Sequence, residues 1–456
     1  RATKEGYAQT KVITTVDFDL QHRAQQIVAD HHERLKGNQI FNAALLVLET
    51  KTGNVLAYVG NTQAGAANQE SVDVIASRRS TGSILKPFLF AAMIDEGKML
   101  PKTLIPDIPT TINGFSPKNF SHDYDGAVAA DQALIRSLNI PAVYELRDYR
   151  YEKLHELLKQ VGLTSLDRSA DHYGLSLILG GAEGTLWDIT GAYASMARTL
   201  TGYFEHPGKN RYNKNDFHPP SFTKKDSARN SQGNEFVENS YLSAAAIWQT
   251  FEALKEVYRP GEETGWRYFN SSKKIAWKTG TSFGFRDGWA VGVNPDYAVG
   301  VWVGNADGEG RPGLVGTETA APILFDVFSL LPGQSWFQQP ASEMEQVSIC
   351  SKSGQRASDV CMEVDKHWIV KAGLNTSACQ FHKLVHLSED KRYRVNTTCA
   401  SIDEMKAASW FVLPAVQEYY FKSKNLSYKS LPPYKQGCDN PAAIASMDII
   451  YPKSNS

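Results

Sequence analysis

The order of strand-like and helical segments along the chain is the feature that most limits its fold. Two short apolar runs, 44–48 and 55–59, lie near the start and are separated by the turn residues 50–54, a pattern typical of a β-hairpin. Three further strand-like runs lie within 275–303, and the stretch between the two groups is mainly helical. Strands need hydrogen-bonding partners, so we expect both groups to meet in one sheet with the helices packed on it.

The predicted fold is therefore α+β, with a five-stranded antiparallel sheet flanked by helices and a smaller cysteine-containing C-terminal region. The clearest predicted helix is amphipathic and runs from Asp19 to Leu35, and the polar residues 203–240 are expected to form a surface insertion. A hairpin turn at Asn294-Pro295-Asp296 separates the last two strands. The three late strands are predicted at 275–281, 288–293 and 297–303.

Length and composition describe a folded protein of several domains. The 456 residues are enough for about three domains. A formal net charge of −1 argues against a nucleic-acid-binding protein, and no apolar run reaches the roughly 18 residues that a membrane span needs. The chain has neither a signal peptide nor an initiator Met, so we expect it to be a piece of a longer protein.

Four segments are expected along the chain. Residues 1–16 are predicted to be a linker from an upstream module, and 17–332 to form the main domain. Residues 346–445 are predicted to form the cysteine-containing C-terminal region, and 446–456 to begin a further β domain.

The cysteines are confined to the end of the chain. All five lie after residue 349, at Cys350, Cys361, Cys379, Cys399 and Cys438. Such a distribution favours an extracytoplasmic region held by disulfides. We therefore predict two disulfides within 346–438, with Cys350–Cys361 as the short-loop pairing. The rival interpretation is a zinc site made by Cys379, His382 and His386, because Cys-x-x-His is a common spacing of zinc ligands.

A possible nucleophile and its base occur together just before a buried helix. Ser83 and Lys86 lie three residues apart, and the apolar run 88–94 follows them. Residues three apart share a helix face, so the Lys86 amine can reach the Ser83 hydroxyl. A serine needs such a base to act as a nucleophile at neutral pH. The same spacing at Ser221, Ser271 and Ser388 lies in polar, turn-rich sequence and is better explained by solvated surface.

Two further motifs follow in the chain. Ser137-Leu138-Asn139 lies at the end of a predicted helix that Ile140-Pro141 is expected to stop. Lys278-Thr279-Gly280-Thr281-Ser282 lies on a strand rich in Ile, Ala and Trp. Alone, the first is more often a cap or turn and the second an edge strand with a solubilising lysine. Their order after Ser83 and Lys86 matches the motif set of serine acyl-enzymes that react with β-lactams.

The residue types suit acyl transfer. Ser83 would attack a carbonyl and Lys86 would accept the serine proton, while Ser137 would relay a proton to the leaving amine. Asn139 would hold a substrate amide and contact Lys86, and Lys278 would supply a positive charge that lowers the pKa of Lys86. The strand would bind substrate through Thr279, Gly280, Thr281 and Ser282, and the N–H groups of Ser83 and Thr281 would form an oxyanion hole.

At this level of detail the chain resembles the transpeptidase module of class A penicillin-binding proteins over roughly residues 12–330. Beyond the three motifs, the resemblance is carried by five short segments. They are Thr14-Thr15-Val16-Asp17, Leu20-Gln21, Leu179-Gly180-Gly181-Ala182-Glu183, Arg259-Pro260-Gly261 and Phe285-Arg286-Asp287.

The resemblance implies a penicillin-binding transpeptidase or serine β-lactamase-like fold and a peptidoglycan D,D-transpeptidase that works through an acyl-serine. It implies stem peptides as substrates, β-lactams as covalent inhibitors, a periplasmic location, and an upstream glycosyltransferase module with a membrane anchor. Neither a cofactor nor a metal is expected in the active site.

Two other functions stay open on the sequence. One is a hydrolase of the same fold, a D,D-carboxypeptidase or β-lactamase. Glu145 is the nearest candidate for the glutamate that deacylation by water needs in class A β-lactamases, although it lacks the neighbours of that loop. The other is a non-catalytic β-lactam sensor that stays acylated.

Overall fold

The computed structural model describes residues 11–206, 208–230, 235–260 and 273–438. The predicted start of a further β domain at 446–456 lies outside the described residues, as do residues 1–10 of the predicted linker, Gly261 and Ser271. No helix of the described part is long and apolar enough to cross a membrane.

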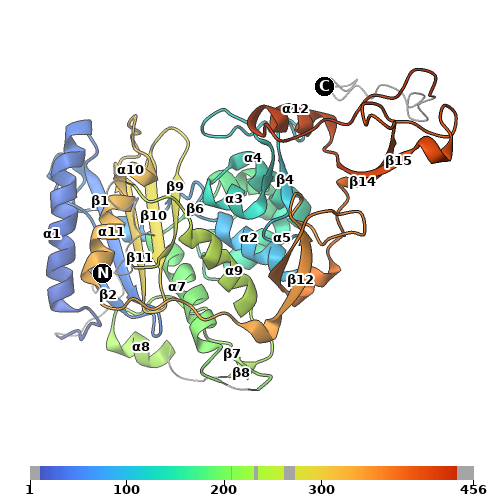
Figure 1. The fold of residues 1–456 in the computed structure, drawn as a ribbon. Coiled ribbons are helices and arrows are strands. Elements are labelled where there is room, and N and C mark those ends of the chain that lie inside the picture. Colours follow the sequence, from blue (N-terminus) through green and yellow to red (C-terminus); the bar gives the residue numbers. More distant parts are fainter. Residues whose placement is uncertain (1–10, 207, 231–234, 261–272, 439–456) are drawn as a thin grey trace.

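A five-stranded antiparallel sheet forms the centre of the molecule (Figure 1). Its order is β2-β1-β11-β10-β9, so the early hairpin joins the late strands as predicted. Asn42 pairs with Gly304 and Glu49 with Tyr297 along the β1–β11 seam. The strands are β1 (Asn42–Glu49), β2 (Val55–Val59), β9 (Ala276–Thr281), β10 (Asp287–Val293) and β11 (Tyr297–Gly304).

Helices cover both faces of this sheet (Figure 1). On one face lie α1 (Phe18–Leu35) and α11 (Ala321–Leu330), and on the other lie α7 (Leu186–Gly202) and α9 (Ala244–Lys255). Glycines in the strands allow this close packing. A Cβ on Gly292 would lie 2.9 Å from the Phe328 ring of α11, and a Cβ on Gly300 would collide with Thr190 of α7.

A second group of helices lies beside the sheet and surrounds α2 (Lys86–Asp95). Every residue of α2 from Lys86 to Ile94 is buried, as expected for an apolar helix without a polar face. The remaining helices of this group are α3 (Ala130–Ile135), α4 (Asn139–Tyr149), α5 (Tyr151–Gln160) and α6 (Ala170–Tyr173). The short strands around it are β3 (Arg79–Ser80), β4 (Leu104–Asp107), β5 (Gly126–Ala129) and β6 (Glu183–Gly184).

The predicted insertion at 203–240 holds the early part of the chain. It contains β7 (Tyr212–Asn213), α8 (Lys224–Asn230) and β8 (Phe236–Val237). The Thr15 hydroxyl donates to the carbonyls of Val55 and Ser221 at 2.8 and 2.9 Å. The part of the predicted linker that the structure describes is therefore bound to the main domain.

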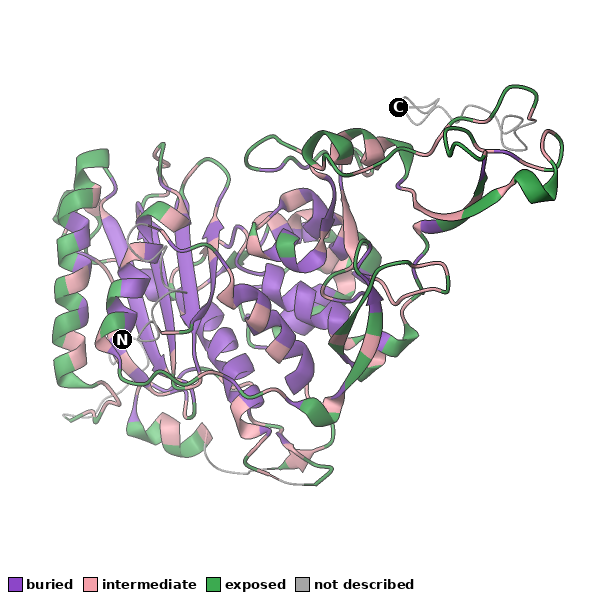
Figure 2. Ribbon diagram, viewed as in Figure 1, coloured by how far each residue is buried: buried purple, intermediate pink, exposed green. Residues whose placement is uncertain are grey.

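The C-terminal region packs differently from the main domain. It consists of two antiparallel hairpins, β12–β13 and β14–β15, and a helix that packs against β5. Figure 2 shows a mostly buried sheet and α2 in the main domain, whereas the hairpins are largely exposed or intermediate. The elements are β12 (Met344–Cys350), β13 (Val364–Val370), β14 (His382–Leu387), β15 (Lys406–Phe411) and α12 (Ala415–Lys424).

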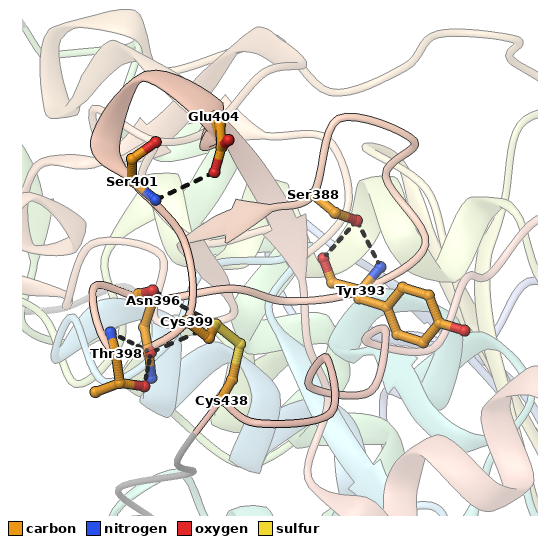
Figure 3. Close-up of a disulfide and its surroundings, with 8 residues drawn as sticks. All are labelled: Ser388, Tyr393, Asn396, Thr398, Cys399, Ser401, Glu404 and Cys438. Carbon is orange, nitrogen blue, oxygen red and sulfur yellow. Dashed lines mark hydrogen bonds between the residues drawn. A yellow bond between two sulfur atoms is a disulfide. The ribbon is translucent and has the colours of Figure 1, made fainter.

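The predicted Cys350–Cys361 pairing and the predicted number of two disulfides are both wrong. Cys399 and Cys438 form the disulfide of the described residues (Figure 3), while Cys350, Cys361 and Cys379 are free. Which cysteines pair depends on long-range backbone hydrogen bonds and not on the length of the loop between the cysteines. Arg394 accepts from Lys435 N at 2.9 Å and donates its own N–H to Pro433 at 2.8 Å. These bonds bring two distant segments together and place the two cysteines in reach.

Candidate active site

Ser83 lies in a tight turn directly before α2. The Ile84 N–H donates to Thr81 O at 3.2 Å and the Lys86 N–H to Ser83 O at 3.3 Å. In such three-residue turns the side chains at i and i+3 lie over one another, so Ser83 and Lys86 are on the same side. Ser83 is partly exposed between buried neighbours. The predicted nucleophile is therefore open to a ligand, although it precedes the helix instead of lying on it.

Strand β9 lies against this turn, and two glycines allow the approach. A Cβ on Gly82 would lie 2.6 Å from Thr281 O, and one on Gly280 would lie 2.7 Å from Thr81 O. Gly82 also has a φ of 52°, which side chains disfavour. The backbones of the serine turn and of β9 are thus in direct contact, as the predicted oxyanion hole between Ser83 and Thr281 requires.

The Lys86 ammonium has three acceptors. It donates to Ser137 O and Leu138 O at 2.9 Å each and to Asn139 Oδ1 at 2.8 Å. A lysine has three donors, so the charged form is fully bonded to the Ser-x-Asn loop. A neutral Lys86 would keep two donors and gain a lone pair, which is what a base for Ser83 needs.

Ser137 connects the two lysines. Its hydroxyl accepts from Lys278 Nζ at 2.7 Å, while its carbonyl accepts from Lys86. Ser137 has a φ of 57°, in the left-handed region, which lets the loop turn sharply between α3 and α4. The Ser137–Asn139 loop therefore joins Lys86 to Lys278, and Asn139 bonds to Lys86 directly. Ser83 lies in the turn that leads to Lys86 and packs against β9.

The predicted stop at Ile140-Pro141 is wrong. Helix α3 already ends before this point, with Arg136 as its C-cap residue. Asn139 begins α4, and Pro141 lies in the first turn of α4. Proline is tolerated there because first-turn N–H groups have no partner within the helix. The motif is a short loop between two helices.

A residue that sequence reasoning missed holds this loop in place. Asn119 Oδ1 accepts from the N–H groups of Asn139 and Ile140 at 3.0 and 3.2 Å, and its Nδ2 donates to Asp107 Oδ1 at 2.7 Å. Asn119 and Asp107 are buried, and burial raises the Asp107 pKa. The sequence gives only a weak signal for this role, because Asn119 lies in a stretch whose pattern predicts irregular structure. Its role depends on the loop that it meets 20 residues later.

Both lysines are buried in the site. Desolvation lowers the Lys86 pKa well below its usual value, and the Lys278 charge lowers it further. Burial lowers the Lys278 pKa to about 7. The predicted influence of Lys278 on Lys86 agrees with this arrangement, although burial is the larger cause. A lowered pKa gives Lys86 a neutral fraction near neutral pH, as general-base catalysis needs.

The predicted substrate strand divides into two parts. Thr279 and Thr281 are partly exposed, and Thr281 Oγ1 accepts from Gly316 N at 3.0 Å. Ser282 is only 4% exposed, and its hydroxyl accepts from Asp287 N at 2.9 Å. Thr279 and Thr281 therefore border the open side of the site, whereas Gly280 is buried against the serine turn and Ser282 closes the β9–β10 turn.

Glu145 does not have the environment of a deacylating base. It is buried on α4, and its Oε1 has no hydrogen-bond partner among the described residues. Burial raises its pKa to about 8, so the carboxyl is mainly neutral at pH 7. A neutral carboxyl cannot accept a proton from water, which argues against a β-lactamase role for this residue.

Comparison with known proteins agrees with the fold. The family model described as penicillin binding protein transpeptidase domain matches residues 43–325. The chain therefore belongs to the penicillin-binding protein transpeptidase family.

Among curated relatives, the chain is 32% identical over 329 residues to penicillin-binding protein 1C of Escherichia coli (strain K12), which covers 71% of this chain and 39% of that protein. It is 28% identical over 306 residues to penicillin-binding protein 1A of Neisseria cinerea, covering 65% of this chain and 36% of that protein. The chain thus matches well under half the length of these relatives.

Solved structures share the fold. The PonA1 protein from Mycobacterium tuberculosis in complex with penicillin V matches with a TM-score of 0.55 at 20% identity, covering 75% of this chain and 90% of that chain. Penicillin-binding protein 1A from Haemophilus influenzae matches with a TM-score of 0.55 at 21% identity, covering 74% of this chain and 54% of that chain.

Proposed function

We propose that this chain is the catalytic part of a peptidoglycan D,D-transpeptidase that works through an acyl-serine. The observation that carries the proposal is that the Ser137–Asn139 loop joins Lys86 to Lys278, while Ser83 lies in the turn that leads to Lys86 and packs against β9. A nucleophile, two amines with lowered pKa values and a bridging hydroxyl form a complete set for acyl transfer. Family membership supports peptidoglycan stem peptides as the substrate class.

In the acylation half-reaction, Ser83 Oγ attacks the carbonyl of the penultimate D-Ala while its proton passes to neutral Lys86. The N–H groups of Ser83 and Thr281 stabilise the oxyanion that forms. When the tetrahedral intermediate collapses, the bond to the terminal D-Ala nitrogen breaks. The proton then passes through the Ser137 hydroxyl to the leaving amine.

In the second half-reaction, the amine of a neighbouring stem peptide attacks the acyl-serine. The Ser137 hydroxyl and Lys86 accept its proton, Ser83 is released, and a new peptide bond remains as the crosslink. A β-lactam enters the first half-reaction in the same way. Its amide nitrogen stays tethered to the acyl group after the ring opens, so the adduct persists.

The substrate would bind along β9. Among the described strands, β9 is at the edge of the sheet and pairs with β10, so its other side can accept an extended peptide as an added strand. Gly280 leaves room for the serine turn, which packs against this strand. Lys278 and the hydroxyls of Thr279 and Thr281 would bind the terminal carboxylate. The buried position of Ser282 gives it a supporting role in the turn.

The partners and location follow from the same proposal. The chain would work on the periplasmic side of the membrane, joined to an upstream glycosyltransferase module that carries the anchor. No cofactor is needed for the chemistry, because each proton transfer has a side chain to perform it.

The decisive experiment is product analysis with a stem-peptide donor and an added amine acceptor. We expect a crosslinked peptide together with released D-Ala. Free D-Ala without crosslink would indicate a carboxypeptidase. A stable β-lactam adduct in a protein that turns over neither substrate would indicate a sensor. Intact mass after incubation with a β-lactam reports the adduct directly.

A further inference from the structure

Three cysteines and one histidine converge in the C-terminal region, well away from Ser83 in the chain. Cys350 ends β12 and His382 begins β14. Cys361 lies in the loop between β12 and β13, and Cys379 lies in the segment between the two hairpins. Their ligand atoms all lie within 4.8 Å of one another. The sequence predicted neither this group of four nor the participation of Cys350 and Cys361 with His382.

We propose that Cys350, Cys361, Cys379 and His382 bind one structural Zn²⁺ ion. In tetrahedral zinc sites Zn–S is about 2.3 Å and Zn–N about 2.0–2.1 Å, which places sulfur and nitrogen ligands about 3.5 Å apart. His382 Nδ1 lies 3.4 Å from Cys350 Sγ, 3.4 Å from Cys379 Sγ and 3.6 Å from Cys361 Sγ. The three nitrogen–sulfur distances therefore match those around a bound ion, and all four atoms lie within 4.8 Å of one another.

The ligand set and its surroundings indicate a structural and not a catalytic site. Three sulfurs and one nitrogen fill all four positions of zinc and leave none for water or substrate. The Ser353 hydroxyl donates to Cys379 Sγ at 3.2 Å. Ser358 N lies 3.4 Å and its hydroxyl 3.3 Å from Cys361 Sγ. Such donors stabilise thiolates and orient metal ligands.

The region has a physical need for this ion. Its own buried cluster consists of Ile349 and Ile369 together with Leu100 of the main domain. A core of that size contributes little free energy, and small domains commonly add a metal or disulfides. The four ligands connect β12 to β14, so one ion would join the two hairpins. Cys399–Cys438 closes a different part of the region.

The proposed site also borders the active-site domain. Leu104 N, on β4, donates to Ser353 O at 3.0 Å, in the segment that follows Cys350. The same strand carries Asp107, which holds Asn119. The metal would thus hold in place the segment after Cys350, which packs against β4, the strand that carries Asp107.

The rival ligand His386 does not take part. It lies four residues after His382 on β14, on the same side of the strand but about 13 Å farther along, at 3.3 Å per residue. It therefore provides a matched control, being another histidine on the same strand of the same hairpin.

The test begins with the whole chain, purified without chelator. Elemental analysis and native mass should give one zinc per chain. His382→Ala and Cys379→Ser should reduce zinc to background, whereas His386→Ala and Cys399→Ser should retain it. A chelator should release the ion and make three thiols reactive. Co²⁺ in place of zinc should give thiolate-to-metal charge-transfer absorption that His382→Ala alters.

Labelling of Ser83 by a fluorescent penicillin reports whether each variant keeps a folded main domain, so loss of zinc can be separated from general unfolding. Reduced wild-type protein that takes up no zinc would overturn the proposal. So would a disulfide between any two of Cys350, Cys361 and Cys379, equal zinc loss in His386→Ala, or stoichiometric iron in place of zinc.

Discussion

The main domain and the C-terminal region are stabilised by different means. The main domain buries a sheet between two helical layers and buries α2 as well, with a continuous apolar cluster throughout. The C-terminal region has few buried apolar side chains and contains every cysteine. Where burial is large, hydrophobic free energy suffices and polar groups can be left for chemistry. Where burial is small, specific crosslinks have to replace it.

The difference extends to the same motif in the two regions. Ser83/Lys86 and Ser388/Lys391 share the Ser-x-x-Lys spacing. The first lysine is buried, and desolvation together with the Lys278 charge lowers its pKa. In the second, the Ser388 hydroxyl donates to Asp390 at 2.6 Å in an exposed turn, and Figure 3 shows it beside Tyr393. We therefore expect burial, and not the spacing alone, to distinguish a reactive serine–lysine pair from a solvated one.

Ser83→Ala is the strongest test of that contrast. Removing the nucleophile should lower covalent labelling by a fluorescent penicillin by at least about 10³-fold, because binding alone cannot form the acyl bond. Ser388→Ala is the matched control and should label like wild type. Labelling that survives in Ser83→Ala, or that is lost in Ser388→Ala, would contradict the assignment.

Lys278→Ala should slow acylation by roughly 10²–10³-fold, the usual effect of removing one preorganised electrostatic group. With Lys86 as the proposed base, the acylation rate should rise with pH as Lys86 loses its proton. Lys278 lowers the Lys86 pKa, so its removal should raise that pKa and move the rise to higher pH. Stopped-flow acylation across pH measures both effects.

Lys278→Arg is the companion variant and should retain part of the rate, because the charge remains while the compact ammonium does not. An unchanged pH profile in Lys278→Ala, with only weaker β-lactam binding, would show that Lys278 anchors the carboxylate and does not tune Lys86.

Asn119→Leu should have an intermediate effect. It leaves the N–H groups of Asn139 and Ile140 without their acceptor, which costs about 1–3 kcal/mol for a buried group. The Ser-x-Asn loop should loosen and acylation should slow by about tenfold or more. Thermal unfolding and acylation kinetics measure the two effects. Asn61→Leu, at another asparagine with loop contacts but far from this loop, is the control and should leave acylation unchanged.

Cys399→Ser should have the smallest effect on activity and a clear effect on local stability. Opening a disulfide between residues 39 apart removes up to about 4 kcal/mol of stability from the region that it closes. Limited proteolysis should cut the C-terminal region faster while penicillin labelling of the main domain stays at the wild-type level. If penicillin labelling fell as much as the intact C-terminal region did, the two regions would not be stabilised by separate means.

The sequence by itself determined the five strands, their division between the two ends of the chain, the buried helix after Ser83 and the ordered catalytic motifs. These features depend on neighbouring residues, on the alternation of apolar and polar residues, or on the order of the motifs. They can therefore be predicted without knowing which residues contact one another in the fold. The residues that support the site were not readable in this way. Asn119 is an ordinary loop residue until the Ser-x-Asn loop packs against it.

The tertiary structure alone decided which cysteines meet. In the sequence, Cys350 and Cys361 are the natural pair because the loop between them is short. In the folded chain, pairing of Arg394 with the segment around Tyr434 brings Cys399 to Cys438, while the two hairpins bring the other three cysteines to His382. Crosslinks join points that are near in space, and only long-range backbone pairing sets those distances.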